Sequence, residues 1–173
     1  MEYKASLDWA ALTVIAFVTI VFTGIIAAIV NSFDTSKDLL LQSFVFAFTA
    51  ILLAGIYIIC YIFRPLKYII DSGKIIIKRP YKDKVIELSS IKAVYTITKD
   101  SMGWVHKTFG NGGLFGYYGE FRCDRYGDMT WYATRRTNYV MLETHDHERI
   151  VLTPDNVDMV NEIKKLIVQK SSF

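Results

Sequence analysis

Histidine and cysteine, the side chains that most often ligate metals or attack substrates, are sparse in this sequence. His145 and His147 stand one residue apart and could give two imidazole ligands to a transition metal, but no third ligand lies nearby in the sequence. Residues 144–149 are typical of an exposed hairpin turn. Cys60 and Cys123 lie in segments of different character, which indicates two free thiols in a reducing compartment. No catalytic triad, zinc spacing or nucleotide fingerprint occurs, so the sequence predicts a protein that is not an enzyme, with no cofactor and no metal.

A second candidate for chemistry is the glycine-rich stretch at residues 109–121, FGNGGLFGYYGEF. Its amides could cradle the phosphate of a lipid headgroup, helped by Lys107, although no Gly-Lys-Ser/Thr follows as in a P-loop. Two other interpretations stay open. The stretch could be a bulged hairpin whose side chains pack inward in a tightly curved sheet, or a tip that touches the bilayer or a partner. The candidate binding residues are Gly110, Gly112, Gly113, Leu114, Phe115 and Gly116.

Basic residues gather between residues 64 and 84, where seven lysines and arginines stand against two aspartates. Each such residue close to an anionic surface is worth about 1 kcal/mol, so the cluster could orient a domain on anionic lipid. It could equally serve membrane topology alone, and the two roles are compatible. Residues 64–173 carry 18 lysines and arginines against 13 aspartates and glutamates, too small an excess to indicate nucleic acid. The candidate binding residues in this cluster are Arg64, Lys67, Lys74, Lys78 and Arg79.

Two long apolar runs precede the basic cluster. Residues 9–30 give 22 uncharged positions and residues 39–63 give 25. Because about 20 apolar residues cross a hydrocarbon core, both runs are predicted to span a membrane. The polar connection at residues 31–38 is short, as a helical hairpin requires. A cleaved signal peptide is the alternative for the first run; its length, an N-terminus that is not clearly basic and the lack of a small-x-small cleavage site argue against this.

The basic residues around the two runs predict their orientation. One lysine lies in the connection, whereas seven lysines and arginines follow the second run. Since cytoplasmic flanks are enriched in such residues, both termini are expected to be cytoplasmic. Residues 1–63 would then form the membrane hairpin, and residues 64–173 a cytoplasmic domain. The aromatic residues expected as interfacial anchors near these ends are Trp9, Tyr57, Tyr61 and Phe63.

After residue 65 the pattern becomes that of short strands. Strands are predicted at residues 66–71, 74–82, 85–88, 91–98, 130–133, 138–144 and 149–152, with a weaker candidate at 102–109. One amphipathic helix follows at residues 154–168. Thr153 is its expected cap, Pro154 its first helical position, and Asp155 is favourable to the helix dipole. The predicted fold class is α+β: a transmembrane α-helical hairpin, then a small β-barrel or sandwich of about seven strands capped by the C-terminal helix.

Four stretches carry a resemblance to a known family. They are GNGGLFGYYGEF at residues 110–121, Tyr132-Ala133-Thr134, NYVMLET at residues 138–144 and LTPDN at residues 152–156. Together they resemble the bacterial pleckstrin-homology-like (PH-like) domain family over about residues 66–168. Many members of this family carry membrane helices before the domain, and the family implies no established catalytic activity or ligand. The phosphoinositide pattern of eukaryotic relatives is not matched, because the basic residues of the first hairpin stand at other spacings.

These observations lead to one main expectation about function. The protein is expected to be a membrane-tethered, non-catalytic PH-like interaction module at the cytoplasmic face of the bacterial inner membrane, which binds protein partners or self-associates. Two alternatives stay open. One is a sensor of anionic lipid headgroups that uses the basic cluster and the glycine stretch, and the other is an accessory subunit of a larger membrane complex. Nucleic acid is not an expected partner.

Overall fold

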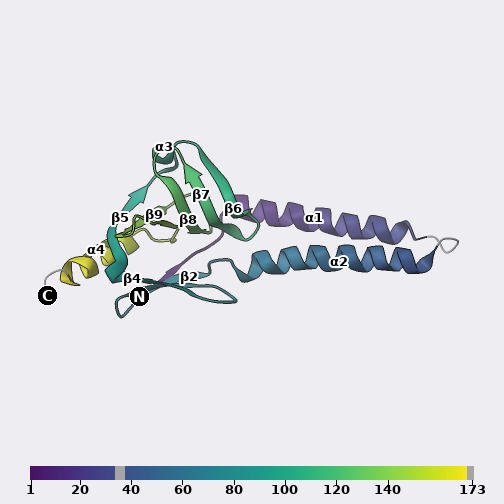
Figure 1. Cartoon of the computed structure of the whole chain (residues 1–173), viewed down its shortest axis with the longest axis horizontal. Helices are drawn as coiled ribbons and strands as arrows, with labels where there is room; N and C mark the ends of the chain where they lie inside the picture. The colour runs from purple at the N-terminus through teal and green to yellow at the C-terminus, as the bar shows by residue number, and fades with distance from the viewer. Residues whose placement is uncertain (34–37, 171–173) are drawn as a thin grey trace.

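A pair of long helices projects from a domain of strands and short helices. The computed structural model describes residues 1–33 and 38–170. The pair consists of α1 (Trp9–Asn31) and α2 (Leu39–Ile62), which run side by side in opposite directions (Figure 1). Residues 34–37 of the expected connection lie outside the described residues.

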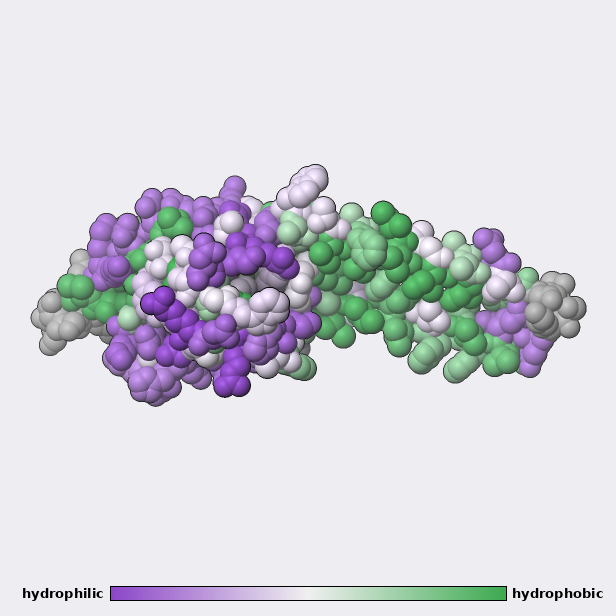
Figure 2. Space-filling model, turned by 90° about the horizontal axis from the view of Figure 1, so that it is seen from above, coloured by the Kyte–Doolittle hydropathy of each residue, from purple (hydrophilic) through white to green (hydrophobic). Residues whose placement is uncertain are grey.

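Both long helices are apolar on all sides, and apart from Ala11 of α1 they lie outside the domain's cores. Their buried side chains are Ala11 and Leu53, and the remaining ones are exposed or half-buried. Figure 2 shows apolar residues along the visible face of the helix pair, beside a domain whose surface is mainly polar. Both helices are long and apolar enough to cross a membrane. Apolar surface of this extent, left uncovered by the rest of the chain, marks a contact with lipid or with another protein.

The first sheet joins the segment that precedes α1 to the segment that follows α2. Its strands are β1 (Glu2–Lys4), β2 (Lys67–Asp71), β3 (Lys74–Lys78) and β4 (Lys84–Glu87), in that order across the sheet. β1 precedes α1 in the chain, and β2 follows α2. The two strands pair antiparallel, with Tyr3 opposite Tyr68. The chain therefore leaves this sheet through α1 and returns to it through α2.

The second sheet has six strands in the order β5-β9-β10-β8-β7-β6. In chain order they are β5 (Ile91–Ile97), β6 (Val105–Gly113), β7 (Gly116–Cys123), β8 (Gly127–Ala133), β9 (Tyr139–Thr144) and β10 (Arg149–Leu152). All neighbours pair antiparallel except β8 and β10, which are parallel. A 3-10 turn, η1 (Leu88–Ser90), leads into β5. The short helix α3 (Lys99–Met102) connects the two edge strands, β5 and β6.

Two apolar cores lie on opposite faces of this second sheet, because successive side chains of a strand point to opposite sides. On β9, Val140 and Leu142 belong to the larger core, whereas Tyr139 and Met141 belong to the smaller one. The larger core lies between the two sheets and is closed by the C-terminal helix α4 (Met159–Lys170). The smaller core is mainly aromatic and sulfur-containing, and α1 contributes Ala11 to it.

The fold class is confirmed, with differences in its β-part. The strands form two sheets rather than one closed barrel, and the described residues contain ten strands rather than about seven. β1 was not expected, because a three-residue strand carries no periodic signal. The weak candidate at residues 102–109 is displaced: Met102 ends α3, which a capping box between Thr98 and Ser101 stabilises, and β6 begins at Val105.

The C-terminal helix begins later than expected. α4 starts at Met159 rather than at residue 154, and Thr153 and Pro154 are buried in an extended segment. Asp155 does not serve a helix N-terminus. Its carboxylate accepts hydrogen bonds from the Ser6 amide and hydroxyl, at 2.9 and 2.6 Å. A contact with a distant part of the chain thus replaces the local capping pattern.

Candidate functional site

The tip of the β6–β7 hairpin is seated against the end of α2. The buried ring of Phe115 packs edge-on against Tyr57 and Tyr61, with ring centroids 4.9 and 5.5 Å apart. The Arg64 guanidinium carbon lies 4.5 Å from the centre of the Tyr61 ring and 5.7 Å from that of Phe115. Each such aromatic or cation–ring contact is worth roughly 0.5 kcal/mol or more. We call Tyr57, Tyr61, Arg64 and Phe115 the aromatic seat.

Two further contacts fix the hairpin to the helix pair. The Tyr118 hydroxyl donates a hydrogen bond to the Cys60 carbonyl in the last turn of α2. Burial raises the pKa of Tyr118, so this hydroxyl stays protonated and remains a donor at neutral pH. On the other helix, Gly113 faces Val14 so closely that a Cβ at the glycine would lie 3.4 Å from Val14 Cγ2. The hairpin therefore touches both helices.

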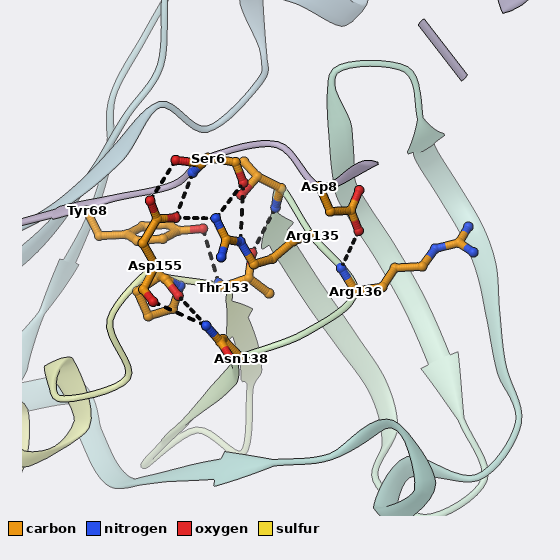
Figure 3. Close-up of polar contacts among 10 residues, drawn as sticks. Ser6, Asp8, Tyr68, Arg135, Arg136, Asn138, Thr153 and Asp155 are labelled. Carbon is orange, nitrogen blue, oxygen red and sulfur yellow. Dashed lines mark hydrogen bonds and ion pairs between the residues drawn. The ribbon is translucent and has the colours of Figure 1, made fainter. Parts of the chain in front are cut away.

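A polar cluster holds the segment between β1 and α1 on the domain (Figure 3). Asp155 accepts from Ser6 and pairs with the Arg135 guanidinium, which also donates to the Ser6 carbonyl at 3.1 Å. Asp8 caps α1 and also accepts from the Arg136 amide at 2.8 Å. We call Ser6, Asp8, Arg135 and Asp155 the N-terminal latch. It links the residues before α1 to the β8–β9 and β10–α4 loops.

The surroundings of Asp155 in the latch favour the ionised form of its carboxyl group. Partial burial acts to raise the pKa of Asp155, but the hydrogen bonds from Ser6 and the charge of Arg135 outweigh burial and hold this pKa below its usual value. The carboxylate is therefore charged at neutral pH, and the pair with Arg135 is only partly open to solvent.

Beneath the latch, Tyr68 of β2 connects the two sheets. Its hydroxyl donates to the Tyr132 carbonyl at 2.6 Å and accepts from the Thr153 amide at 3.2 Å. The Thr153 hydroxyl in turn accepts from the Thr134 amide at 2.8 Å. Complete burial raises the pKa of Tyr68 to about 12. The first sheet is thus tied to the segments that carry the latch.

The structure does not gather the candidate basic residues into one free patch. Three of the lysines form ion pairs: Lys67 with Glu2 at 3.0 Å, Lys74 with Glu87 at 3.4 Å and Lys78 with Asp83 at 2.5 Å. Arg64 belongs to the aromatic seat. Arg79 lies over the rings of Phe63 and Tyr132, each 5.7 Å from its guanidinium carbon, and donates to the Lys82 carbonyl. Most of these charges are therefore engaged within the chain.

The glycine stretch forms the β6–β7 hairpin. Gly110 and Gly119 face each other across its ladder. Asn111 braces the tip, since its carbonyl oxygen accepts from the Leu114 amide at 3.2 Å and its amide donates to the Leu114 carbonyl. Leu114 and Phe115 are buried against the chain itself, and Gly116 also lies in a positive-φ conformation. Lys107 lies beside Gly112, further from the tip.

The pair His145 and His147 and the pair Arg135 and Arg136 lie in different surroundings. His145 and His147 lie in the turn between β9 and β10. Over residues 1–33 and 38–170, no three His, Cys, Asp or Glu side chains come close enough together to hold a metal ion. Arg135 is part of the latch, whereas the Arg136 guanidinium points away from it (Figure 3).

Sequence reasoning missed several of these contacts. Tyr57 and Tyr61 were expected as interfacial anchors, and their contact with Phe115 was not foreseen. Ser6 carried no signal, because its partner Asp155 lies at the other end of the chain. The only available clue was the spacing of Tyr57 and Tyr61, which places both on one face of a helix.

Two packed β-sheets closed by a C-terminal helix and preceded by an apolar helix pair define the class of this protein: a PH-like domain attached to two helices that can cross a membrane. A family model described as "Bacterial PH domain" matches residues 66–167, more than half of the chain. The chain therefore belongs to the bacterial PH domain family. Comparison with curated proteins and with solved structures gave no match.

Proposed function

We propose that this protein spans the bacterial inner membrane with both termini in the cytoplasm. Its PH-like domain would be a non-catalytic module that recognises a protein partner or a second copy of the chain. The observation that carries the proposal is the β1–β2 ladder, which joins the residues before α1 to those after α2. A domain attached at both ends of a helix pair lies on one side of the membrane and close to its surface.

The helices support the membrane assignment. They are apolar all round, and Ala11 and Leu53 are the residues of the two helices that are buried within the described chain. The N-terminal segment argues against a cleaved signal peptide, because cleavage after α1 would remove β1 and the Ser6 and Asp8 members of the latch. The seven basic residues after α2 favour a cytoplasmic domain.

The aromatic seat supports a fixed orientation of the domain. Phe115 is held by two rings of α2, and Gly113 touches α1, so the domain does not hang on a free linker. A domain held in this way presents the same surface to every molecule that approaches along the membrane.

The edge strand β6 is the surface best suited to recognition. It lies at the end of the six-stranded sheet, and residues 106–110 are exposed. Phe109 is 78% exposed, and Trp104, just before the strand, is 74% exposed. An edge strand offers unpaired amides and carbonyls to a strand of another chain, and nearby aromatic residues add apolar contact.

Photo-crosslinking in native membranes tests this proposal. A photoreactive residue at position 109 is expected to give an adduct of discrete mass, while the same residue at position 164, exposed on α4, gives none. An adduct of twice the chain's mass identifies a second copy, and any other discrete mass identifies a different protein. Monomer alone at position 109, or the same adducts at both positions, would overturn the proposal.

A further inference from the structure

A cavity of about 460 Å³ opens on the face of the six-stranded sheet that the first sheet does not cover. α3 and the start of β6 form one wall, and β7, β8 and β9 form the floor. The cavity shares Trp104 with the exposed surface at β6, but it contains no residue of the aromatic seat or the latch, and its floor has no part in the proposed function. A pocket of this size can hold a small molecule.

The floor of the cavity is aromatic. Phe121 stacks on Trp131 with ring centroids 4.5 Å apart, and Tyr139 lies 5.5 Å from Trp131 on its other side. Tyr117 completes this surface. Flat rings side by side form an apolar platform on which a ring or an acyl chain can lie.

Two hydrogen-bond donors on this floor have no partner in the described part of the chain. They are the Trp131 indole Nε1 and the Tyr117 hydroxyl, in side chains that are 4% and 3% exposed. Burial raises the pKa of Tyr117, although the charge of Arg136 acts to lower it, so the hydroxyl is protonated at neutral pH. A buried donor without an acceptor costs about 1–3 kcal/mol, so two of them in residues that line one cavity favour the binding of an acceptor there.

The charged residues that line the cavity are all basic, although two carboxylates lie behind its walls: Asp124 accepts from the Trp104 amide and Asp8 from the Arg136 amide. Lys99, Lys107 and Arg136 line it, and none of its lining residues is acidic. The Arg136 guanidinium lies 4.8 Å from the centre of the Tyr117 ring. Within residues 1–33 and 38–170, none of these three basic side chains forms an ion pair. The Arg136 amide donates a hydrogen bond to Asp8, and this bond fixes the backbone from which the Arg136 side chain extends.

We propose that this cavity binds an oxyanion carried on an apolar body, such as an alkyl phosphate. The apolar body lies on the Phe121, Trp131 and Tyr139 rings. The oxyanion accepts hydrogen bonds from Trp131 Nε1 and the Tyr117 hydroxyl and is neutralised by Arg136. Hydrogen bonds that involve an ionised group are stronger than those between neutral groups.

Such a ligand can come from two sources. Gly112 lines the cavity and its neighbour Gly113 packs on Val14 of α1, so one end of the cavity lies near the first turns of that helix. In the proposed membrane orientation this is the level of the headgroups, from which an anionic lipid can enter. A soluble amphiphilic anion of the cytoplasm has the same chemistry.

The binding experiment uses the full chain in a neutral detergent. Trp9→Phe and Trp104→Phe together leave Trp131 as the only tryptophan of the three, so its fluorescence reports on the cavity floor. Hexyl phosphate is the test ligand, with inorganic phosphate and hexanol as its two separate parts. We expect hexyl phosphate to quench or shift the Trp131 fluorescence in a saturable way. Phosphate or hexanol alone should bind with an affinity at least about tenfold lower.

Matched variants separate a binding role from a structural one. Arg136→Gln is expected to weaken hexyl phosphate binding about tenfold, whereas Arg122→Gln, which removes the same charge from the other face of β7, leaves it unchanged. Tyr117→Phe removes a hydroxyl whose proton meets no acceptor among the described residues, and it keeps the ring beside Arg136. It should therefore weaken binding while it keeps or raises the melting temperature of the ligand-free protein. A purely structural hydroxyl would lower the melting temperature instead.

Three results would overturn the proposal. The first is the absence of a saturable change in Trp131 fluorescence with hexyl phosphate. The second is equal affinity for hexanol and hexyl phosphate. The third is an equal loss of hexyl phosphate affinity in Arg136→Gln and Arg122→Gln. Reconstituted vesicles then distinguish the sources. If phosphatidylglycerol mixed into phosphatidylcholine shifts Trp131 emission in the otherwise unchanged protein but not in Arg136→Gln, the ligand is a lipid. If binding of hexyl phosphate persists in these vesicles without that shift, the ligand is a soluble anion.

Discussion

At the residue scale, two glycines set the shape of the hairpin that meets the helices. Gly110 and Gly119 lie opposite each other with φ angles of +113° and +118°. A Cβ on Gly110 would lie 2.4 Å from the Tyr118 carbonyl oxygen, and one on Gly119 would lie 2.4 Å from that of Phe109. The two backbones approach so closely that neither position has room for a side chain. Gly110 and Gly119 are therefore required by the close approach of the two strands, whatever the hairpin binds.

This close approach predicts a large effect of one added methyl group. Gly119→Ala should lower the free energy of unfolding by about 3 kcal/mol or more, because it combines a strained φ with a backbone clash. Gly127→Ala is the matched control, with φ +69° and no atom within 4 Å of the new Cβ, and should cost about 1 kcal/mol. Thermal unfolding followed by near-ultraviolet circular dichroism measures both. Equal losses would show that the backbones can separate.

Tyr68 gives a second prediction at this scale, with a pH dependence. Tyr68→Phe leaves the Thr153 amide and the Tyr132 carbonyl without their partner and should cost about 1–3 kcal/mol at neutral pH. The pKa of Tyr68 is raised from 10.0 to about 12, so between these pH values the hydroxyl ionises in the unfolded chain and not in the folded one. Its contribution is complete below pH 10 and is lost as the pH rises through 12.

The difference in stability between the unchanged protein and Tyr68→Phe should therefore shrink over this range. Denaturant unfolding at a series of pH values measures it. Tyr81→Phe removes the hydroxyl of an exposed tyrosine and serves as control, with an unchanged free energy of unfolding expected at neutral pH. A gap that stays constant through this range would contradict the buried position of the Tyr68 hydroxyl.

At the scale of elements, the β6–β7 hairpin is both part of the sheet and the contact with the helices. Its strands pair along the whole of β6, and its tip reaches Tyr57, Tyr61 and Val14. Asn111 braces the turn that presents Phe115. Loss of the contact at the tip should free the domain relative to the helices without unfolding the sheet.

Phe115→Ala tests this role of the hairpin. It removes the ring between Tyr57 and Tyr61 and should broaden the distance distribution between spin labels at positions 40, on α2, and 92, on β5. The melting temperature of the domain should change little, because Phe115 lies outside both cores. Phe109→Ala is the control from the same hairpin, since this ring is exposed and should leave the distances narrow. Distances that stay narrow in Phe115→Ala would show that the ladder and latch alone orient the domain.

The sequence predicts the elements whose signals are local. The alternation in residues 91–98 predicts β5, the stretch NYVMLET at residues 138–144 predicts β9, and the long uncharged runs predict α1 and α2. The elements it misses depend on distant partners. β1 has three residues and a partner strand that follows both helices, so no window of sequence contains its pairing. The late start of α4 has the same cause, because Asp155 is used by Ser6 and Arg135.

In the candidate site, too, the sequence predicts the features with local signals and misses those that depend on distant partners. Glycine placement in residues 109–121 predicts a tight hairpin, and the hairpin forms there. The basic cluster in residues 64–84 looks like one feature in the sequence, but the fold pairs three of its five lysines with Glu2, Glu87 and Asp83. Two of these partners lie on neighbouring strands, which a count of charges cannot reveal. The Arg135–Arg136 pair is divided by the fold into a latch residue and a cavity residue.

At the scale of the whole molecule, the domain sits at one end and the apolar helices extend from it (Figures 1 and 2). The latch, the β1–β2 ladder and the aromatic seat all lie where the helices meet the domain. In the proposed orientation, the far end of the helix pair reaches the outer face of the membrane.

Cysteine labelling tests this orientation in intact cells. In a chain without Cys60 and Cys123, Ser32→Cys at the end of α1 should react with a membrane-impermeant maleimide added outside. Lys84→Cys, on the domain, should react only after the cells are opened. Labelling of both positions after opening is the control for their accessibility. The reverse pattern would place the domain outside the cytoplasm and contradict the proposal.

The β1–β2 ladder also has a consequence for how the protein is made. A ribosome synthesises β1 before α1, but its partner strand emerges only after α2. In the proposed topology, the first strand therefore waits unpaired on the cytoplasmic side while both helices enter the bilayer. If one helix fails to insert, the two strands end on opposite sides of the membrane, and the three residue pairs between them cannot form. The domain's first sheet is then left without an edge strand, so completion of the fold depends on completed insertion of the hairpin.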